Sequence, residues 1–450
     1  MKLKWPFWGD ESIIQASDSL GFAAMHPSIL WGVIRALRAI LGVMLLMLLL
    51  NPVISRASQS DENQQWSLDR ASTWASQKPW GLGFNYVPRY AINQLEMWQQ
   101  TTFDAEIIDQ ELGWAAEIGF NSVRVFLHHL LWQQDAAGFL QRIDEFLAIA
   151  DSHSIDVMFV LFDDVWNPMP QLGRQPEPRT GVHNSGWVQS PGAAILGDLK
   201  RHDELESYVK GILSAYRDDR RVAVWDLYNE PGNLNGISYG YSELQDKQGY
   251  SLSLLKKVFA WARSEHPNQP LTAGVWRLNE GRWRGQQTND PGAALFDFML
   301  QHSDILSFHS YENAANTAKA IMALDAKGRP MLCTEYMARG YDSTFEALLP
   351  LFAEKNIGAM HWGFVSGKSQ TIYPWRSWVS IIRFWDRLFA DRPNPWHHDL
   401  LHADGRPYRP EEVQFIRALI NRKLGQHRSE IRTNQKLGAE VLKDAAPRQG

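Results

Sequence analysis

Two glutamates stand where acid–base chemistry could be done. Glu230 lies in WDLYNEPG, just beyond the apolar run 222–228, and Glu335 lies in CTEYM, within the apolar run 330–336. If both runs are strands of one parallel barrel, the two carboxylates share its mouth, because the carboxyl ends of parallel strands lie together. Such a pair can break a glycosidic bond. One carboxyl group protonates the leaving oxygen while the other attacks the anomeric carbon.

The elements that must position this pair repeat along the chain from about residue 80. Short apolar runs alternate with longer stretches of helical periodicity, such as 104–119, 139–153 and 203–219. The apolar runs are continuous, which is typical of parallel strands covered on both faces. We count eight of them, at 81–87, 122–127, 156–162, 222–228, 271–276, 305–311, 330–336 and 358–364.

Eight such units over about 340 residues predict an α/β fold with one closed (β/α)8 barrel, a TIM barrel. An open doubly wound sheet is the alternative, and it usually carries a glycine-rich phosphate loop. The segment GLGFN at 81–85 lacks the third glycine of that motif. Long loops at 163–197, 230–250 and 277–291 each follow a predicted strand, so we expect them to build a shared face around a cleft.

The chain resembles the clan A glycoside hydrolases, and within them the cellulase-like enzymes of family 5, over about residues 80–420. The pair Asn229-Glu230 stands after the fourth run, and Glu335 stands at the end of the seventh, as in that family. The resemblance implies that Glu230 is the catalytic acid/base and that Glu335 is the nucleophile. It also implies that Asn229 hydrogen-bonds the sugar 2-hydroxyl.

Further positions match the family's pattern. The resemblance implies that Arg124 in SVRVF supports the nucleophile. It also implies that His309 and Tyr311 in SFHSY belong to the site, and that Trp362 in MHWGF forms the floor under the sugar. Arg124 and Tyr311 can donate hydrogen bonds to the carboxylate of Glu335. Those bonds favour its ionised form, which a nucleophile requires.

The third run ends differently from the family's pattern, which commonly has a histidine there. This chain reads FDDVWNP at 162–168, so Asp163, Asp164 or Asn167 takes that position. We expect Asp163 and Asp164 to bind substrate by contacting sugar hydroxyls. The alternative is that these two residues cap the loop that follows.

The function predicted from these residues is a retaining glycoside hydrolase acting on β-linked glycans or glycosides by double displacement. The alternatives are a transglycosylase using the same site, a non-catalytic carbohydrate-binding barrel, and a metal-dependent barrel hydrolase. Neither cofactor nor metal is expected. The histidines of WHHDLLH at 396–402 do not match the two-histidine helical zinc motif. Cys333 is the only cysteine and is expected to be a buried packing residue. His128 and His129 follow the second run and could line the cleft.

Composition bears on the partners. The formal net charge is −5 and no basic block occurs, so nucleic acid is not an expected partner. The chain holds 20 tryptophans and 13 tyrosines, whose rings can stack on the C–H faces of sugars. We therefore expect an oligo- or polysaccharide substrate and a monomeric protein.

The N-terminal region predicts export. Residues 39–50 read AILGVMLLMLLL, with Arg35 and Arg38 before them and the small residues Ser55 and Ala57 after them. This is the outline of a signal peptide, and a protein released from it would be periplasmic or secreted. If residues 29–54 are retained, they could anchor the protein in a membrane. The expected organisation is 1–57 signal or anchor, 58–79 polar linker, 80–423 barrel and 424–450 disordered polar tail.

Overall fold

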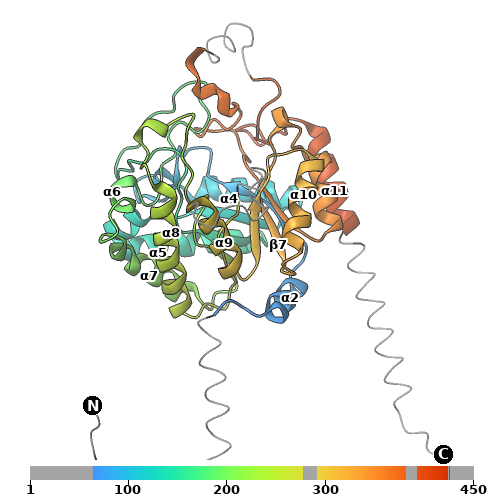
Figure 1. Ribbon diagram of the computed structural model, residues 1–450. Coiled ribbons are helices and arrows are strands. Elements are labelled where there is room, and N and C mark those ends of the chain that lie inside the picture. The colour runs from blue at the N-terminus through green and yellow to red at the C-terminus, as the bar shows by residue number, and fades with distance from the viewer. Residues whose placement is uncertain (1–63, 277–290, 382–392, 424, 426–450) are drawn as a thin grey trace, which may run out of the picture. The chain divides into compact units, whose positions relative to one another are not determined.

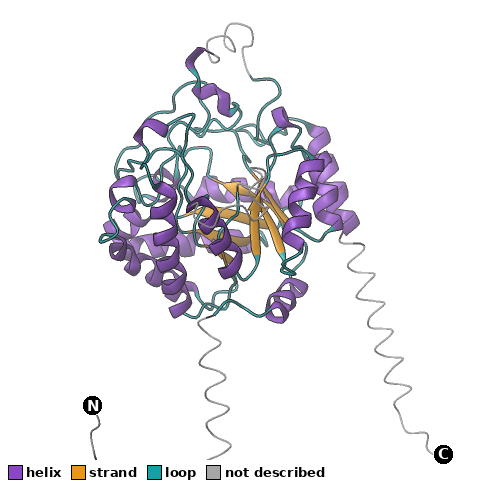
Figure 2. Cartoon of the chain, viewed as in Figure 1, coloured by secondary structure: helices purple, strands orange, loops and turns teal. Residues whose placement is uncertain are grey.

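The computed structural model describes residues 64–276, 291–381, 393–423 and Gly425. Parallel strands lie at the centre and helices surround them (Figures 1 and 2). The strands are β1 (Leu82–Tyr86), β2 (Ser122–Phe126), β3 (Asp156–Val160), β4 (Val222–Asp226), β5 (Leu271–Thr272), β6 (Leu306–His309), β7 (Met331–Glu335) and β8 (Gly358–His361).

The sheet closes on itself. Its strand order is β5-β4-β3-β2-β1-β8-β7-β6, and all of its ladders are parallel. Between the two ends, Val275 bridges Phe308, and the Val275 N–H donates to the Ser307 carbonyl at 2.9 Å. The predicted (β/α)8 barrel is thereby confirmed, and each of its strands falls within a predicted apolar run.

Helices follow the strands and cover the barrel. They are α2 (Leu68–Gln77), α3 (Gln94–Trp98), α4 (Ala105–Ile118), α5 (His129–Ser152), α6 (Ala193–Leu196), α7 (Glu206–Tyr216), α8 (Lys247–Ser264), α9 (Pro291–His302), α10 (Ala314–Asp325), α11 (Phe345–Glu354) and a last helix over 410–423. Short 3-10 helices η1 (His202–Leu205), η2 (Gly240–Ser242), η4 (Arg339–Tyr341) and η5 (Trp375–Trp378) lie in the connections.

Alternate side chains of a strand lie in different surroundings. In β2, Val123 and Val125 belong to the large apolar core, whereas Arg124 joins a buried polar network and Phe126 packs in a separate cluster. Successive side chains of a strand point to opposite faces, so one set packs under the helices and the other fills the barrel. This is why a buried arginine can stand in the middle of an apolar run.

The end of the barrel opposite the long loops is plugged by apolar residues and covered by α2 (Figure 1). Trp66 and Ala71 pack there against Met158 and Met360. The backbone N–H of Trp66 also donates to Asp304 Oδ1 at 2.7 Å. The expected polar linker over 58–79 is therefore folded from Trp66 onward, because burial of that indole and of one face of α2 outweighs the polar composition.

Several predictions fall on residues that the structure leaves undescribed. The export segment 1–57, most of the loop 277–291 and nearly all of the tail 424–450 lie outside the described residues. Among the residues that are described, no helix is both long and apolar enough to cross a membrane.

Candidate active site

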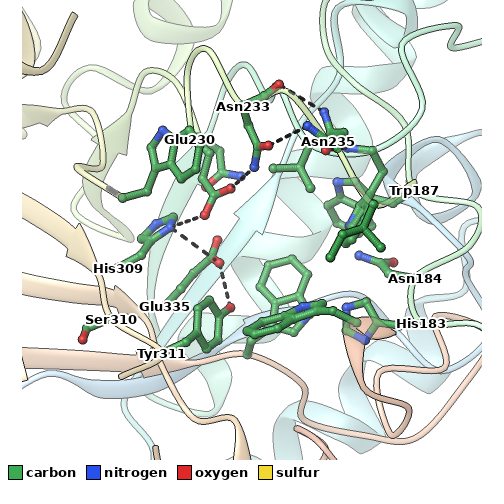
Figure 3. Close-up of a pocket in the computed structure, with 18 of the residues that line it drawn as sticks. His183, Asn184, Trp187, Glu230, Asn233, Asn235, His309, Ser310, Tyr311 and Glu335 are labelled. Atoms are coloured by element: carbon green, nitrogen blue, oxygen red, sulfur yellow. Dashed lines mark hydrogen bonds and ion pairs between the residues drawn. The ribbon is translucent and has the colours of Figure 1, made fainter. Parts of the chain in front are cut away.

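The two predicted catalytic glutamates lie together at the mouth of the barrel (Figure 3). Glu335 is the last residue of β7, and Glu230 follows β4 by four residues. Glu230 has a backbone φ of 43°, a left-handed conformation that is uncommon for a residue with a side chain. One oxygen from each carboxylate and one ring nitrogen of His309 all lie within 4.8 Å of one another. The strand ends therefore bring both acids and one histidine to a single point.

The carboxylate of Glu335 is buried and held at both oxygens. Arg124 Nη1 donates to Oε1 at 2.9 Å, and the Tyr311 hydroxyl donates to Oε2 at 2.8 Å. Burial and the negative charge of Glu230 raise the pKa of Glu335, while His309, Arg124 and Tyr311 oppose that rise. The net direction is upward, although the sequence predicted only the stabilising contacts. Desolvation of a fully enclosed carboxylate is the effect that sequence reasoning left out.

Arg124 donates hydrogen bonds to three side chains besides Glu335. Its Nε and Nη2 donate to Asp226 Oδ2 at 3.0 and 2.8 Å, Nη1 donates to Asn85 Oδ1 at 2.7 Å, and Nη2 donates to Asn229 Oδ1 at 2.6 Å. Full burial of the side chain lowers its pKa, but the carboxylates of Asp226 and Glu335 outweigh burial, so the pKa is raised overall. A guanidinium held this way cannot turn away from Glu335, so it orients the carboxylate of Glu335 as well as balancing its charge.

Glu230 is held by two neighbours. His309 Nδ1 lies 2.9 Å from Oε1, and the Asn233 side-chain amide donates to Oε2 at 2.6 Å. Burial lowers the pKa of His309 to about 4, so the imidazole is neutral near pH 7. A neutral ring with its proton on Nδ1 can donate to Glu230, and the same nitrogen lies 3.6 Å from Glu335 Oε2. The ring therefore stands between the two carboxylates without adding a full charge.

Asp163 and Asp164 lie behind the pocket wall and do not line the pocket, which corrects the prediction that they contact sugar. Asp163 accepts hydrogen bonds from the Asn229 amide at 2.9 Å and from Trp187 Nε1 at 2.6 Å. It also accepts from the Val165 N–H at 2.9 Å, so the loop-capping alternative fits better. Burial raises the pKa of Asp163 to about 8, against the effect of these bonds. Through its bond to Asn229, Asp163 positions a side chain that lines the pocket.

The carboxylates open into a pocket of about 470 Å³. Trp362 lines it, as predicted, and packs edge-on against Phe126 and Trp187, with ring centroids 5.8 and 5.7 Å away. Other aromatic lining residues come from the loops after β3, β5, β7 and β8, namely Trp166, Trp187, Trp276, Tyr341 and Trp375. Aromatic walls around a few polar groups are typical of a sugar site.

Sequence reasoning missed several residues that shape this site. Asn85 and Asp226 are the polar members of otherwise apolar strands, and that pattern was a signal that they face the barrel interior. Asn233 and Asn184 also line the pocket, but each lies in a loop whose path no local pattern specifies.

Four of the other histidines noted in the sequence, His128, His129, His397 and His398, are buried and do not line the pocket. His128 Nε2 lies 3.0 Å from the Gln189 carbonyl and His129 Nδ1 lies 3.0 Å from Ser190 Oγ, and neither residue lines the pocket. His397 and His398 are buried, and burial lowers the pKa of both, to about 3 for His397. Cys333 is fully buried, in keeping with the packing role expected of it.

Glu230, His309 and Glu335 are also the one group among the described residues that could supply three ligand atoms to a metal ion. The guanidinium of Arg124 already occupies one oxygen of Glu335, and Asn233 occupies one oxygen of Glu230. A cation placed here would lie beside a buried positive charge, which disfavours its binding.

No protein-family model matches the chain, and no curated protein matches its sequence. Solved structures resemble it in fold. The protein GH5_18 from Bifidobacterium longum has 16% identity over 78% of this chain and 79% of its own, with a TM-score of 0.50. An exo-β-1,4-mannosidase from an Opitutaceae bacterium has 17% identity over 76% and 60%, with a TM-score of 0.49. At 16% identity, the likeness to the Bifidobacterium longum protein shows the barrel fold alone. The molecule is thus a (β/α)8-barrel protein with paired carboxylates in an aromatic pocket.

Proposed function

We propose that this protein is a retaining glycoside hydrolase that cleaves β-linked glycans or glycosides by double displacement. The observation that carries the proposal is the placement of Glu230 and Glu335, because one oxygen of each carboxylate and one ring nitrogen of His309 all lie within 4.8 Å of one another. Retaining enzymes hold their two carboxyl groups roughly 5–5.5 Å apart, whereas inverting enzymes leave roughly 6.5–9.5 Å to admit a water molecule. The close pair favours direct attack by one carboxylate.

Each group has a role in the proposed reaction. Glu335 in its ionised form attacks the anomeric carbon while Glu230 protonates the departing oxygen, so one C–O bond forms as another breaks. Glu230, now ionised, then takes a proton from water, and that water displaces Glu335 from the sugar. Arg124 and Tyr311 aim the nucleophile, and His309 and Asn233 aim the acid/base.

The test uses aryl β-glycosides of glucose, mannose, galactose and xylose with wild type, Glu335→Ala and Glu230→Ala. We expect Glu335→Ala to lose activity on every substrate. We expect Glu230→Ala to retain the highest rate of its first step on substrates with good leaving groups. Added azide should restore turnover in this variant and yield a β-glycosyl azide. Wild type should release the β-anomer first in proton NMR. Equal activity in wild type and Glu335→Ala would contradict the nucleophile assignment.

The same panel separates the alternatives. An added acceptor sugar that becomes lengthened identifies a transglycosylase. Oligosaccharide binding without cleavage identifies a binding barrel. A chelator should leave the rate unchanged, because the carboxylate pair and Arg124 supply the charges that the reaction needs. A rate that falls with chelator and returns with a divalent cation would favour the metal-dependent alternative.

A further inference from the structure

The loop after β3 is fastened to the loop after β8 across the barrel mouth. Hydrogen bonds between the two loops include Gly181 N to Gln370 Oε1 (2.9 Å) and His183 N to Ser377 Oγ (2.9 Å). Trp378 Nε1 also donates to the His183 carbonyl (2.8 Å), and Asn184 N donates to the Ser369 carbonyl (2.8 Å). The rings of Trp166 and Trp378 also stack, with centroids 5.5 Å apart. We call residues 179–187 and 369–378 together the end wall.

The end wall bridges the part of the mouth above β1 and β2, because these two strands lie between β3 and β8 in the barrel. The loop after β1 supports it from below. Asn93 Nδ2 donates to the Gly186 carbonyl at 2.8 Å, and the Lys368 N–H donates to the Arg89 carbonyl at 3.0 Å. Three loops thus hold one side of the pocket shut.

The end wall stands on the side of the pocket away from the acid/base. Figure 3 shows His183 and Asn184 across the pocket from Glu230 and His309. An acid/base protonates the leaving group, so the leaving part of the substrate lies beyond Glu230. The sugar that is attacked therefore lies toward the end wall. Trp362, the predicted floor beneath that sugar, packs against Trp187 of the same wall.

Asn184 is a buried polar residue of this wall where it borders the pocket. It lines the pocket with only 1% of its surface exposed, and its backbone φ is 47°. Neither its side-chain oxygen nor its side-chain nitrogen has a hydrogen-bond partner among the described residues. A buried amide without partners is unfavourable. A sugar hydroxyl, which both donates and accepts, can satisfy it.

From these observations we infer that the enzyme removes the non-reducing terminal sugar of a β-linked chain. The end wall stops the chain from extending past the attacked sugar, and Asn184 hydrogen-bonds hydroxyls of that terminal sugar. This inference rests on the proposed function and adds to it the substrate class, namely chain ends rather than chain interiors.

The first experiment maps the cleavage position. Short β-linked oligosaccharides labelled at the reducing end are compared with the same oligosaccharides carrying a bulky acetal across two hydroxyls of the non-reducing terminal sugar. We expect the free chains to lose one sugar at a time. On the blocked chains we expect the rate to be lower by a factor of about 100 or more. Internal cleavage of blocked chains alongside aryl glycoside hydrolysis would overturn the inference and leave the proposed function standing. Failure on all substrates overturns both.

The second experiment tests Asn184 with Asn184→Gly. Glycine keeps the left-handed backbone and the N–H bond to Ser369 while removing the amide. Its control is Asn356→Gly, an exposed asparagine with a φ of 53° outside this pocket. We expect both variants to melt at similar temperatures. Only Asn184→Gly should lower kcat/KM on an aryl glycoside, by on the order of 10- to 100-fold.

Singly deoxygenated aryl glycosides then separate contact from mere structural support. Wild type should discriminate strongly against the glycoside that lacks the hydroxyl bound by Asn184, and Asn184→Gly should discriminate much less at that position. Unchanged kcat/KM in Asn184→Gly, or unchanged discrimination at every hydroxyl, removes Asn184 from the proposal.

Discussion

Burial and the neighbouring hydrogen-bond donors act in opposite directions on the pKa of Glu335. Enclosure raises the pKa of Glu335, while Arg124 and Tyr311 counter that rise with hydrogen bonds to both of its oxygens. Enclosure also lowers the pKa of His309 to about 4, which leaves a neutral donor beside Glu230. In the proposed mechanism, these hydrogen bonds favour the ionised form of Glu335 that a nucleophile requires.

Tyr311→Phe should shift the pH dependence. Losing this hydroxyl raises the pKa of Glu335 further. The nucleophile must be ionised, so activity disappears as pH falls through that pKa, and the acid limb of kcat/KM should move to higher pH. The loss at acid pH should be roughly 10- to 100-fold, the worth of a hydrogen bond to a charged group. Tyr216→Phe, which loses a buried hydroxyl bonded to the Leu140 carbonyl, should keep the wild-type profile. An unmoved acid limb in Tyr311→Phe would count against Glu335 as the titrating nucleophile.

At the scale of elements, consecutive residues after β3 tie neighbouring loops together. Asp164 accepts hydrogen bonds from the Tyr228 hydroxyl at 2.8 Å, the Gly232 N–H at 2.6 Å and the Ser251 hydroxyl at 2.5 Å. These donors lie on both sides of Glu230 along the chain. Asp164 therefore fixes the path of the loop that carries Glu230, although it is buried and does not line the pocket.

Asp164→Ala should lower both stability and turnover. It leaves three buried donors unpaired, which should cost about 2–4 kcal/mol of unfolding free energy in urea denaturation. Ser251→Ala removes only one of those donors and should cost about 1 kcal/mol. Equal stability of Asp164→Ala and wild type would mean that the loop after β4 is held by other contacts.

At the scale of the whole molecule, the last helix is fastened to the mouth of the barrel. Arg339, in the loop after β7, donates to both oxygens of Glu412 at 2.7 and 2.6 Å, and both side chains are buried. The same guanidinium donates to the carbonyls of Trp396 and His398. One ion pair therefore joins the helix over 410–423 to segments next to the pocket.

Glu412→Ala should be strongly destabilising, by about 3–5 kcal/mol, because it leaves Arg339 buried without its counter-charge. Glu411→Ala is the matched control, because the side chain of Glu411 is exposed. Its removal should change stability by less than about 0.5 kcal/mol. Thermal and urea unfolding of the two variants measure the difference. Comparable midpoints would show that the ion pair is not what holds this helix.

We propose that the first 57 residues direct export. After expression in a bacterial host, the protein should appear in the periplasm or medium with a new N-terminus at Ser58, beyond the small residues Ser55 and Ala57. N-terminal sequencing and fractionation measure this. Retention in the membrane fraction with residues 29–54 intact would instead identify an anchor, and an uncleaved cytosolic chain would contradict export.

The sequence alone was enough to predict the barrel and the two glutamates. Eight continuous apolar runs with helical stretches between them are local patterns, and both acids stand at the ends of such runs. Arg124 lies within β2, and His309, Tyr311 and Trp362 stand at or just beyond strand ends, so the barrel geometry gathers them wherever the loops go.

Only the tertiary structure decided which groups touch. It placed Asp163 and Asp164 behind the wall, and it turned Asn184 and Asn233 into the pocket. It also enclosed Glu335 deeply enough to raise its pKa. The physical reason is that strand ends follow from periodicity within the chain. A loop's path and a carboxylate's desolvation depend instead on contacts between residues far apart in sequence, such as the bond from Asn184 to Ser369.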